Sequence, residues 1–286
     1  MRDVRLALLR PEEVLAEMAR VPLVFLPVGV IEWHGPHLPL GTDMLLATDM
    51  AERLARELGG VVHPAVFCGT ERERRAAMLR DIGFGGGEWI VGMDFPANAM
   101  KSYYYPEETL ALLVRDALSQ LVEHGYRLIV IVNGHGAENQ IGTLRRLAAA
   151  TTAAGRARAL VVLPFPLERD EQGRETTSAG HADIYETAVL LALHPESVDL
   201  AQLPPPGRPL RNTDWAVMDG ATFSGSPTPE HTVREQQDPR RATAEAGRAF
   251  LEAVFARVSA EVRAALAGAD AGLKTRARCG KPASAG

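Results

Sequence analysis

Four unbroken apolar runs of strand length do most to limit what this chain can fold into. They lie at residues 21–31, 61–67, 128–132 and 159–163. A run without alternating polar residues is typical of a strand buried on both faces, as in a parallel sheet that is covered by helices. Segments of helical periodicity separate the runs, at residues 45–58, 107–124, 141–153 and 184–193, and a long final helix is expected over 238–265. This alternation predicts one α/β domain with helices on both faces of its sheet.

The predicted domain spans residues 1–267, since 286 residues are an ordinary length for a single α/β domain. Two stretches interrupt the strand–helix pattern. Residues 69–105 hold a charged patch and a glycine tract, and residues 203–229 are rich in proline, glycine and threonine. Long ordered loops of this kind commonly bind ligands or act as lids. Residues 268–286, rich in alanine, glycine and lysine, are expected to form a flexible tail.

Charge and hydropathy exclude several classes of protein. Lys and Arg number 31 against 36 Asp and Glu, which gives a formal net charge of -5, so neither nucleic acid nor a membrane surface is an expected partner. No apolar run approaches the ~18 residues that span a bilayer. Arg, Pro and Glu interrupt the first twenty residues, unlike a secretory signal. Two cysteines cannot form a disulfide framework. We therefore expect a cytoplasmic protein.

The densest group of titratable residues follows the first predicted strand, in the segment GVIEWHGPHLPLGTD at residues 29–43. Glu32 and His34 alternate in an extended stretch, so both can face one cleft beyond the end of the sheet. Asp43 can return to that cleft at the start of the next helix, where it or Thr42 is a plausible N-cap. Carboxylate and imidazole groups suit Zn or Mn. The alternative is a solvated loop with a capping Asp, but so many titratable groups beside glycines favour a site.

Two further motifs are predicted to reach the same edge of the sheet. The segment NGHGAEN at residues 133–139 ends an apolar strand and presents His135, although it could be a turn in which Asn133 or Asn139 caps the next helix. The segment AGHADIYET at residues 179–187 places His181 before a helix and Glu186 in its first turn. By itself, such a Glu more often stabilises the helix dipole.

Together these motifs resemble the creatininase (creatinine amidohydrolase) family. The resemblance lies in E-x-H-G-x-H-L-P-x-x-T-D, the NGH turn and H-A-x-x-x-E-T, and the segment DPRRATAEAG at residues 238–247 is similar to the family's C-terminal segment. It implies a three-layer α/β/α sandwich with a mostly parallel central sheet. It also implies two divalent metal ions per subunit, Zn and/or Mn, a small-molecule substrate and a homo-oligomer, with a hexamer favoured.

The resemblance also implies roles for individual residues. Glu32 and His135 match the ligands of one metal ion, His34 matches a ligand of the other, and Asp43 matches the bridging carboxylate. Glu186 is the preferred completing ligand. Glu138 is the alternative candidate, either as a ligand or as a catalytic residue, because the segment after the NGH histidine is one residue longer here than in creatininase itself.

The remaining site residues are expected to act around the metal ions. His181 matches a histidine that contacts substrate and can transfer a proton to the leaving nitrogen. Gly136 and Thr70 are candidate substrate contacts, and His37 and Asn133 are candidates for orienting the ligands from behind.

The reaction implied is hydrolysis of a C–N bond in a small cyclic or linear amide by a metal-activated water. Relatives of other specificity suggest alternatives: C–C hydrolysis of a cyclic ketone, or a formamide or peptide hydrolase of cofactor biosynthesis. A non-catalytic binding protein is the least favoured alternative. Creatinine itself is not expected as substrate, because the segment 69–74 lacks the family's Gly-x-Ser-x-x-His pattern and no Trp precedes His181.

The segment 69–105 leaves two further questions open. Tyr103, Tyr104 and Tyr105, with Trp89, could form a pocket wall or a subunit interface. Arg72 and Arg74 could bind an anionic substrate, but a solvated face of mixed charge is the favoured interpretation.

Overall fold

Four parallel strands make up the central sheet of the computed structural model, which describes residues 3–169, 175–177, 179–223 and 225–279. Their order across the sheet is β2 (Val61–Val62), β1 (Leu23–Val28), β3 (Leu128–Asn133) and β4 (Arg158–Val162). Leu23 pairs with Leu128 and Val28 pairs with Asn133, so the carboxyl ends of β1 and β3 lie side by side. The predicted strand over 61–67 is shorter than expected because Pro64 interrupts it, and pairing with β1 resumes only at Val66.

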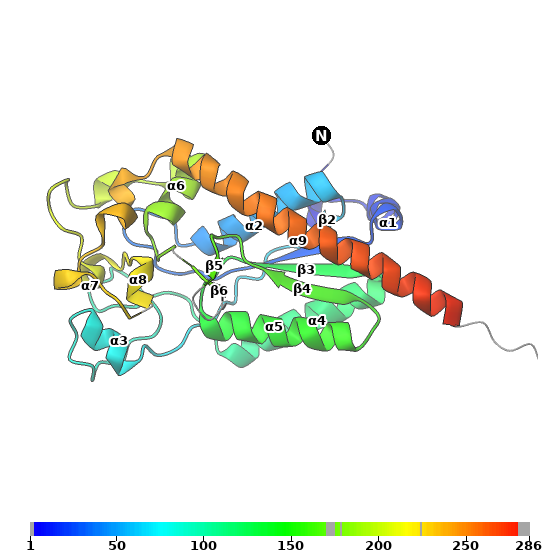
Figure 1. The fold of residues 1–286 in the computed structure, drawn as a ribbon, viewed down its shortest axis with the longest axis horizontal. Coiled ribbons are helices and arrows are strands. Elements are labelled where there is room, and N and C mark those ends of the chain that lie inside the picture. The colour runs from blue at the N-terminus through cyan, green and yellow to red at the C-terminus, as the bar shows by residue number, and fades with distance from the viewer. Residues whose placement is uncertain (1–2, 170–174, 178, 224, 280–286) are drawn as a thin grey trace, which may run out of the picture.

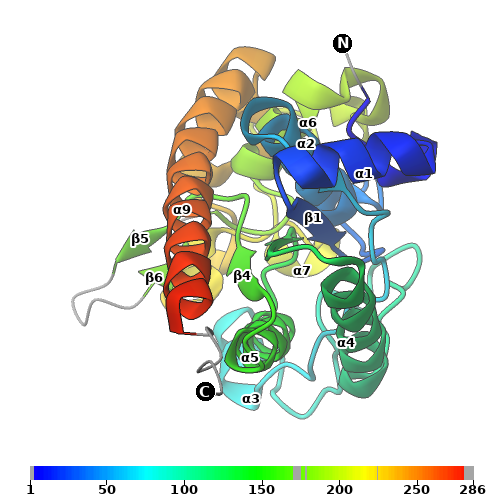
Figure 2. The same cartoon turned by 90° about the vertical axis from the view of Figure 1, so that its right-hand side faces the viewer.

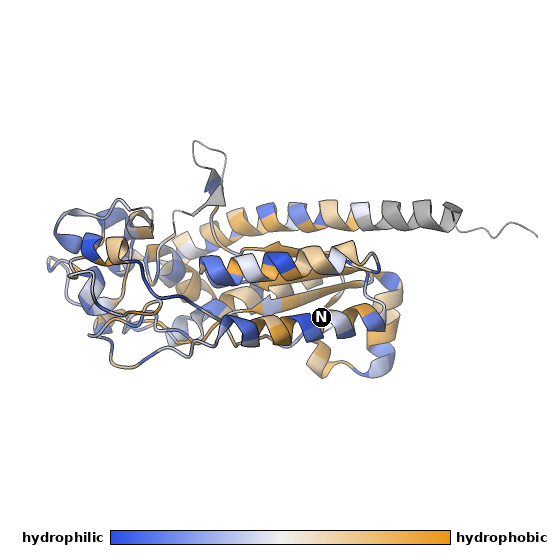
Figure 3. Cartoon of the chain, turned by 90° about the horizontal axis from the view of Figure 1, so that it is seen from below, coloured by the Kyte–Doolittle hydropathy of each residue, from blue (hydrophilic) through white to orange (hydrophobic). Residues whose placement is uncertain are grey.

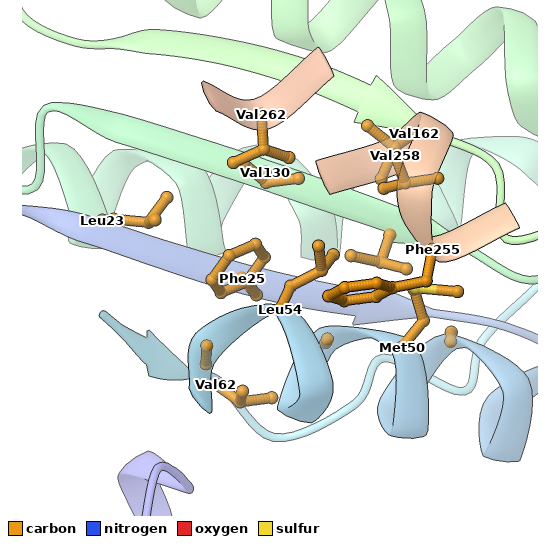
Figure 4. Close-up of a cluster of buried hydrophobic side chains, with 14 of the residues drawn as sticks. Leu23, Phe25, Met50, Leu54, Val62, Val130, Val162, Phe255, Val258 and Val262 are labelled. Carbon is orange, nitrogen blue, oxygen red and sulfur yellow. The ribbon is translucent and has the colours of Figure 1, made fainter. Parts of the chain in front are cut away.

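Alternate residues of each strand enter two different apolar clusters, one on each face of the sheet. On one face, Leu23 and Phe25 of β1 pack against α2 (Thr42–Leu58) and α9 (Ala244–Cys279), as Figure 4 shows. On the other face, Val24 and Leu26 pack against α4 (Glu107–His124) and α5 (Glu138–Ala153). Figure 2 shows these two helices on the side of the sheet opposite α2 and α9. The two faces together account for the unbroken apolar strands and confirm the predicted three-layer α/β/α arrangement. Figure 3 shows these strands mainly in orange, between helices of mixed hydropathy.

The predicted helices are present, with shifted ends. Helix α2 begins at Thr42 and α5 at Glu138, each three residues before the predicted start, and α6 spans Ile184–Leu193 as predicted. Helix α1 (Pro11–Arg20) was not expected, although a Pro at its first position and acidic residues in its first turn are ordinary start signals. Helix α9 extends to Cys279, so much of the predicted tail is helical, and residues 280–286 lie outside the described residues.

The two predicted excursions pack against each other. Residues 69–105 contain α3 (Ala76–Asp81), and residues 203–229 contain α7 (Asn212–Trp215) and α8 (Gly220–Phe223), which Figure 1 shows together at one end of the molecule. A separate apolar cluster joins them: Leu79, Ile82, Ile90, Met93 and Phe95 from the first, with Ala216 and Met218 from the second. The short pair β5 (Glu168–Arg169) and β6 (Glu175–Thr176) is antiparallel. No helix among the described residues is long and apolar enough to cross a membrane.

Two helical glycines predict opposite effects of a single methyl group. In α9, a Cβ at Gly247 would lie 1.9 Å from the carbonyl oxygen of Ala188 in α6, whereas in α5 a Cβ at Gly142 would meet only the end of Arg146, at 3.5 Å. We expect Gly247→Ala to destabilise the protein by about 2 kcal/mol or more, because α6 and α9 must separate. The matched variant Gly142→Ala should stabilise it by about 0.5 kcal/mol through backbone entropy. Urea unfolding of both variants measures this, and equal effects would contradict the close packing.

Candidate metal centre

Six buried or half-buried side chains meet where the strands end and two helices begin. We call them the carboxylate–histidine cluster; its members are Glu32, His34, Asp43, His135, His181 and Glu186. Because β1 and β3 are neighbours in register, the segments that follow them emerge at one edge of the sheet, the usual ligand-binding edge of an open parallel sheet. The first turns of α2 and α6 add the remaining two carboxylates. The structure therefore brings together His181 and the five preferred ligands predicted from the three motifs, but not the alternative ligand Glu138.

Close backbone contact lets Asp43 reach this edge. Helix α2 is not capped by a side chain: Gly41 is its N-cap residue, and the Thr42 hydroxyl donates to the Pro39 carbonyl at 2.8 Å. The expected capping role of Thr42 or Asp43 is thus wrong, and the Asp43 carboxylate instead enters the cluster. A Cβ at Gly134 would lie 2.0 Å from the carbonyl oxygen of Asp43, so only glycine fits there.

The two oxygens of Asp43 face different histidines. Oδ1 lies 3.1 Å from His34 Nε2, and Oδ2 lies 2.9 Å from His135 Nδ1. Around this carboxylate, Glu32 Oε2 lies 3.3 Å from His135 Nδ1, and Glu186 Oε2 lies 3.7 Å from His34 Nε2. Asp43 therefore stands between two ligand-like groups, one on each of its oxygens.

The donor set fits divalent cations. Candidate ligand atoms within 4.8 Å of one another form three groups: Glu32, Asp43 and His135; His34, Asp43 and Glu186; and Glu32, His34 and His181. The first two share Asp43, as a bridged pair of ions requires. Among the described residues no group hydrogen-bonds the buried Asp43 Oδ2, although His135 approaches it closely. Carboxylate oxygens together with imidazole nitrogens suit Zn or Mn.

Opposite charges in the cluster shift the pKa of its members. Burial would raise the pKa of Glu32, but His135, His181 and His34 outweigh it and hold that pKa well below its usual range. Burial likewise opposes the charged form of His34, yet Glu186, Asp43 and Glu32 raise its pKa to about 10. The carboxylates thus stabilise positive charge beside them, and protonated His34 and His135 provide it when no cation is bound.

His181 is held in one tautomer. Its Nε2–H donates to the Trp33 carbonyl oxygen at 2.6 Å, so Nδ1, which lies 3.9 Å from Glu32 Oε2, carries the lone pair of the neutral ring. Burial and the neighbouring His34 lower the pKa of His181 to about 3. The backbone of His181 pairs with Met218 through two hydrogen bonds of 2.9 and 2.8 Å. The second excursion therefore fixes this histidine in place.

The start of α6 positions Glu186. Asp183, which the sequence analysis did not single out, is the N-cap residue, and its carboxylate accepts from the backbone N–H groups of Tyr185, Glu186 and Gly180. Asp is a preferred N-cap residue, so its position directly before the predicted helix could have indicated this role. Ala182 adopts a positive φ of 52°, and its N–H donates to Glu186 Oε2 at 2.6 Å. Local backbone geometry thus directs the Glu186 carboxylate toward His34.

The other predicted residues lie around the cluster. Glu138 and Gly136 are exposed, and Glu138 belongs to none of the three groups found among the described residues. Thr70 is buried and accepts from Asn139 at 3.4 Å. Asn133 does not cap α5; it donates to the His135 carbonyl at 2.6 Å. His37 is buried and pairs with the Thr187 hydroxyl at 2.9 Å.

Two residues of the first excursion have roles that the sequence analysis did not predict. Arg74 does not lie on a solvated face: it is mostly buried, pairs with Glu71 at 2.8 Å and donates to the Gly92 carbonyl at 2.7 Å. The hydroxyl of Tyr104 donates to Glu32 Oε1 and accepts from the Met93 N–H at 3.0 Å. In the sequence, Arg74 lies in a run of mixed charge and Tyr104 in a run of three tyrosines. Neither pattern indicates which side chain of the run faces inward.

The glycine contact yields a sharp prediction. Gly134→Ala should displace Asp43 and lower the metal content and the Tm together, since the methyl group would overlap the Asp43 carbonyl. Gly136→Ala is the matched control, because a Cβ there meets nothing within 4 Å. Elemental analysis and thermal unfolding check both variants. A Gly134→Ala protein with wild-type Tm and metal content would contradict the close approach.

Comparison with known proteins identifies the family of the chain. The family model for creatininase (creatinine amidohydrolase) matches residues 7–262. The creatinine amidohydrolase of Pseudomonas putida is 27% identical over 191 residues, which are 62% of this chain and 66% of that protein. The mycofactocin precursor peptide peptidase of Mycolicibacterium smegmatis is 32% identical over 188 residues, 62% of this chain and 60% of that protein. These alignments thus span less than two thirds of each relative's length.

Solved structures share the fold over nearly the whole chain. A creatinine amidohydrolase (creatininase) superposes with a TM-score of 0.63 at 23% identity and covers 92% of this chain and 97% of its own. A manganese form of creatininase gives 0.64 at 23% identity, with 93% and 99% covered. Because the family model extends over most of the sequence, the chain belongs to the creatininase (creatinine amidohydrolase) family.

Proposed function

We propose that this protein is a metal-dependent hydrolase that cleaves a C–N bond of a small cyclic or linear amide. The observation that carries the proposal is the Asp43 carboxylate, whose two oxygens serve two different groups of candidate ligands. A carboxylate shared in this way is typical of two-metal hydrolytic sites. Family membership supports the same reaction class.

The ligand assignment follows the two groups. Glu32 and His135 would hold one ion and His34 and Glu186 the other, with Asp43 between them. Creatininase has been solved in a Zn-Zn type and a Mn form, which supports Zn and/or Mn as the metals. When bound there, two such ions would supply a water of lowered pKa and polarise an amide carbonyl.

His181 is placed to handle a proton. Its Nδ1 lone pair faces the cluster, while the Trp33 carbonyl holds the opposite side of the ring. In the resting state the ring is therefore neutral, with Nδ1 as its open acceptor position. It can take a proton from the attacking water and return it to the leaving nitrogen. The Trp33 carbonyl and the Glu32 carboxylate would stabilise the imidazolium that forms between these steps.

Removing candidate ligands should separate the two metal positions. We expect about two equivalents of Zn or Mn in the wild-type protein and loss of both, with loss of turnover, in Asp43→Ala. Glu186→Gln should lose one equivalent, whereas Glu138→Gln, at an exposed position outside the cluster, should keep both. Elemental analysis of protein purified without a metal-binding tag measures this. Loss of metal in Glu138→Gln with retention in Glu186→Gln would reverse the assignment.

Two classes of amide are candidate substrates: a small cyclic or linear amide, and a peptide. The relatives described as mycofactocin precursor peptide peptidases favour a peptide hydrolase as the second candidate. A weaker match, 24% identical over 127 residues, is the 3-dehydro-scyllo-inosose hydrolase of Thermotoga maritima, which keeps C–C hydrolysis of a cyclic ketone as an alternative.

A substrate panel distinguishes these reactions. Lactams, linear amides, formamides, short peptides and cyclic ketones should be assayed with the metal-loaded protein, and we expect amine release from at least one amide. Asp43→Ala is the control for contaminating activity. Turnover of a cyclic ketone with no release of amine from any amide would contradict the proposed C–N specificity.

Oligomeric state and location stay predictions. By analogy with the family we expect a homo-oligomer, with a hexamer favoured, in the cytoplasm. Light scattering coupled to size-exclusion chromatography would measure the oligomeric state.

A further inference from the structure

Backbone hydrogen bonds fix the segment that contains Tyr104 beside the first motif. The Tyr103 N–H donates to the Ile31 carbonyl at 2.8 Å, and the Trp33 N–H donates to the Ser102 hydroxyl at 3.0 Å. The Tyr105 N–H donates to the Gly69 carbonyl at 2.9 Å. Tyr103 is exposed, whereas the Tyr104 side chain enters the molecule next to Glu32. Tyr104 is thus the member of the tyrosine run that contacts the cluster, and its backbone neighbours are held on both sides.

The phenol engages one oxygen of Glu32 and leaves the other to the cluster. Its single proton is donated to Glu32 Oε1, and the Met93 N–H fills an acceptor position on the same hydroxyl. Glu32 Oε2 lies 3.3 Å from His135 Nδ1 and 3.9 Å from the nearest nitrogens of His34 and His181. The two carboxylate oxygens therefore have distinct surroundings.

The geometry points to Tyr104 as a positioning residue that holds the Glu32 carboxylate with Oε2 toward the histidines, ready to bind a cation. A carboxylate can bind a metal ion with one oxygen or with both. A hydrogen-bond donor on one oxygen occupies one of its lone pairs and fixes the rotation of the carboxylate group, which favours binding through the other oxygen. The inference rests on the proposed function, because it assigns Glu32 as a ligand. The inference goes beyond that function because Tyr104 belongs to the first excursion, residues 69–105, and to none of the three motifs. A role for Tyr104 would extend the metal centre to that excursion.

Loss of an outer hydrogen bond to a metal ligand commonly weakens metal binding by about 10–100-fold. A purely structural role for Tyr104 predicts a different outcome, because phenylalanine fills the same space. Loss of the hydroxyl would then lower the stability of metal-free and metal-loaded protein alike. Metal affinity, measured apart from activity, distinguishes these two roles.

The experiment compares three Tyr→Phe variants in the full chain. Tyr104→Phe removes the hydrogen bond to Glu32. Tyr103→Phe removes an exposed hydroxyl, and Tyr185→Phe removes a buried one that donates to the Pro164 carbonyl. Zn and Mn affinities are measured by competition with a chromogenic chelator. The Tm is recorded for each variant with and without metal.

We expect Tyr104→Phe to bind one of its two equivalents about 10–100-fold more weakly and to show a smaller metal-induced rise in Tm. Both controls should keep wild-type affinities, with Tyr185→Phe losing only stability. If Tyr104→Phe binds both equivalents as tightly as the wild-type protein, the positioning role is wrong, whatever its Tm. If the wild-type protein binds no metal, the proposed function fails first.

Discussion

Burial of three carboxylates in one small volume is the constraint on which the rest of this structure depends. Glu32 and Asp43 are almost fully buried, and the Glu186 side chain is 13% exposed. An isolated buried carboxylate is strongly unfavourable unless positive charge and hydrogen bonds accompany it. The nearby histidines provide such compensation at Glu32 and Asp43, whose pKa values are lowered, whereas burial outweighs His34 at Glu186 and raises its pKa to about 8. The same group of carboxylates makes this volume suitable for divalent cations.

Much of the surrounding architecture holds these groups at their short separations. Neighbouring parallel strands deliver two of the motifs to one edge, and a glycine at position 134 lets α2 approach the end of β3. A capped helix start directs the third motif inward. These devices act on the backbone, so the cluster is largely assembled by the fold before any ligand binds.

Local rules explain why most of the fold and cluster could be predicted from the sequence. Unbroken apolar runs reveal strands buried on both faces, and polar residues directly after such runs must reach the same sheet edge. Tyr104 could not be predicted in this way, because its inward orientation depends on the pairing of residue 103 with residue 31, far away in the sequence. The extra length of α9 was missed for a different reason: its alanine-rich end contains glycines that suggest a stop, but helix propensity there is otherwise high.

The backbone pairing of His181 with Met218 connects the carboxylate–histidine cluster to the packing between the two excursions. Met218 belongs to the excursion that packs on residues 79–95 of the first excursion. A substitution that shifts this packing would also move the backbone that carries the His181 imidazole. Under the proposed function, a change in the packing of the two excursions would therefore also move the proton-transfer residue, so the two could change in evolution only together.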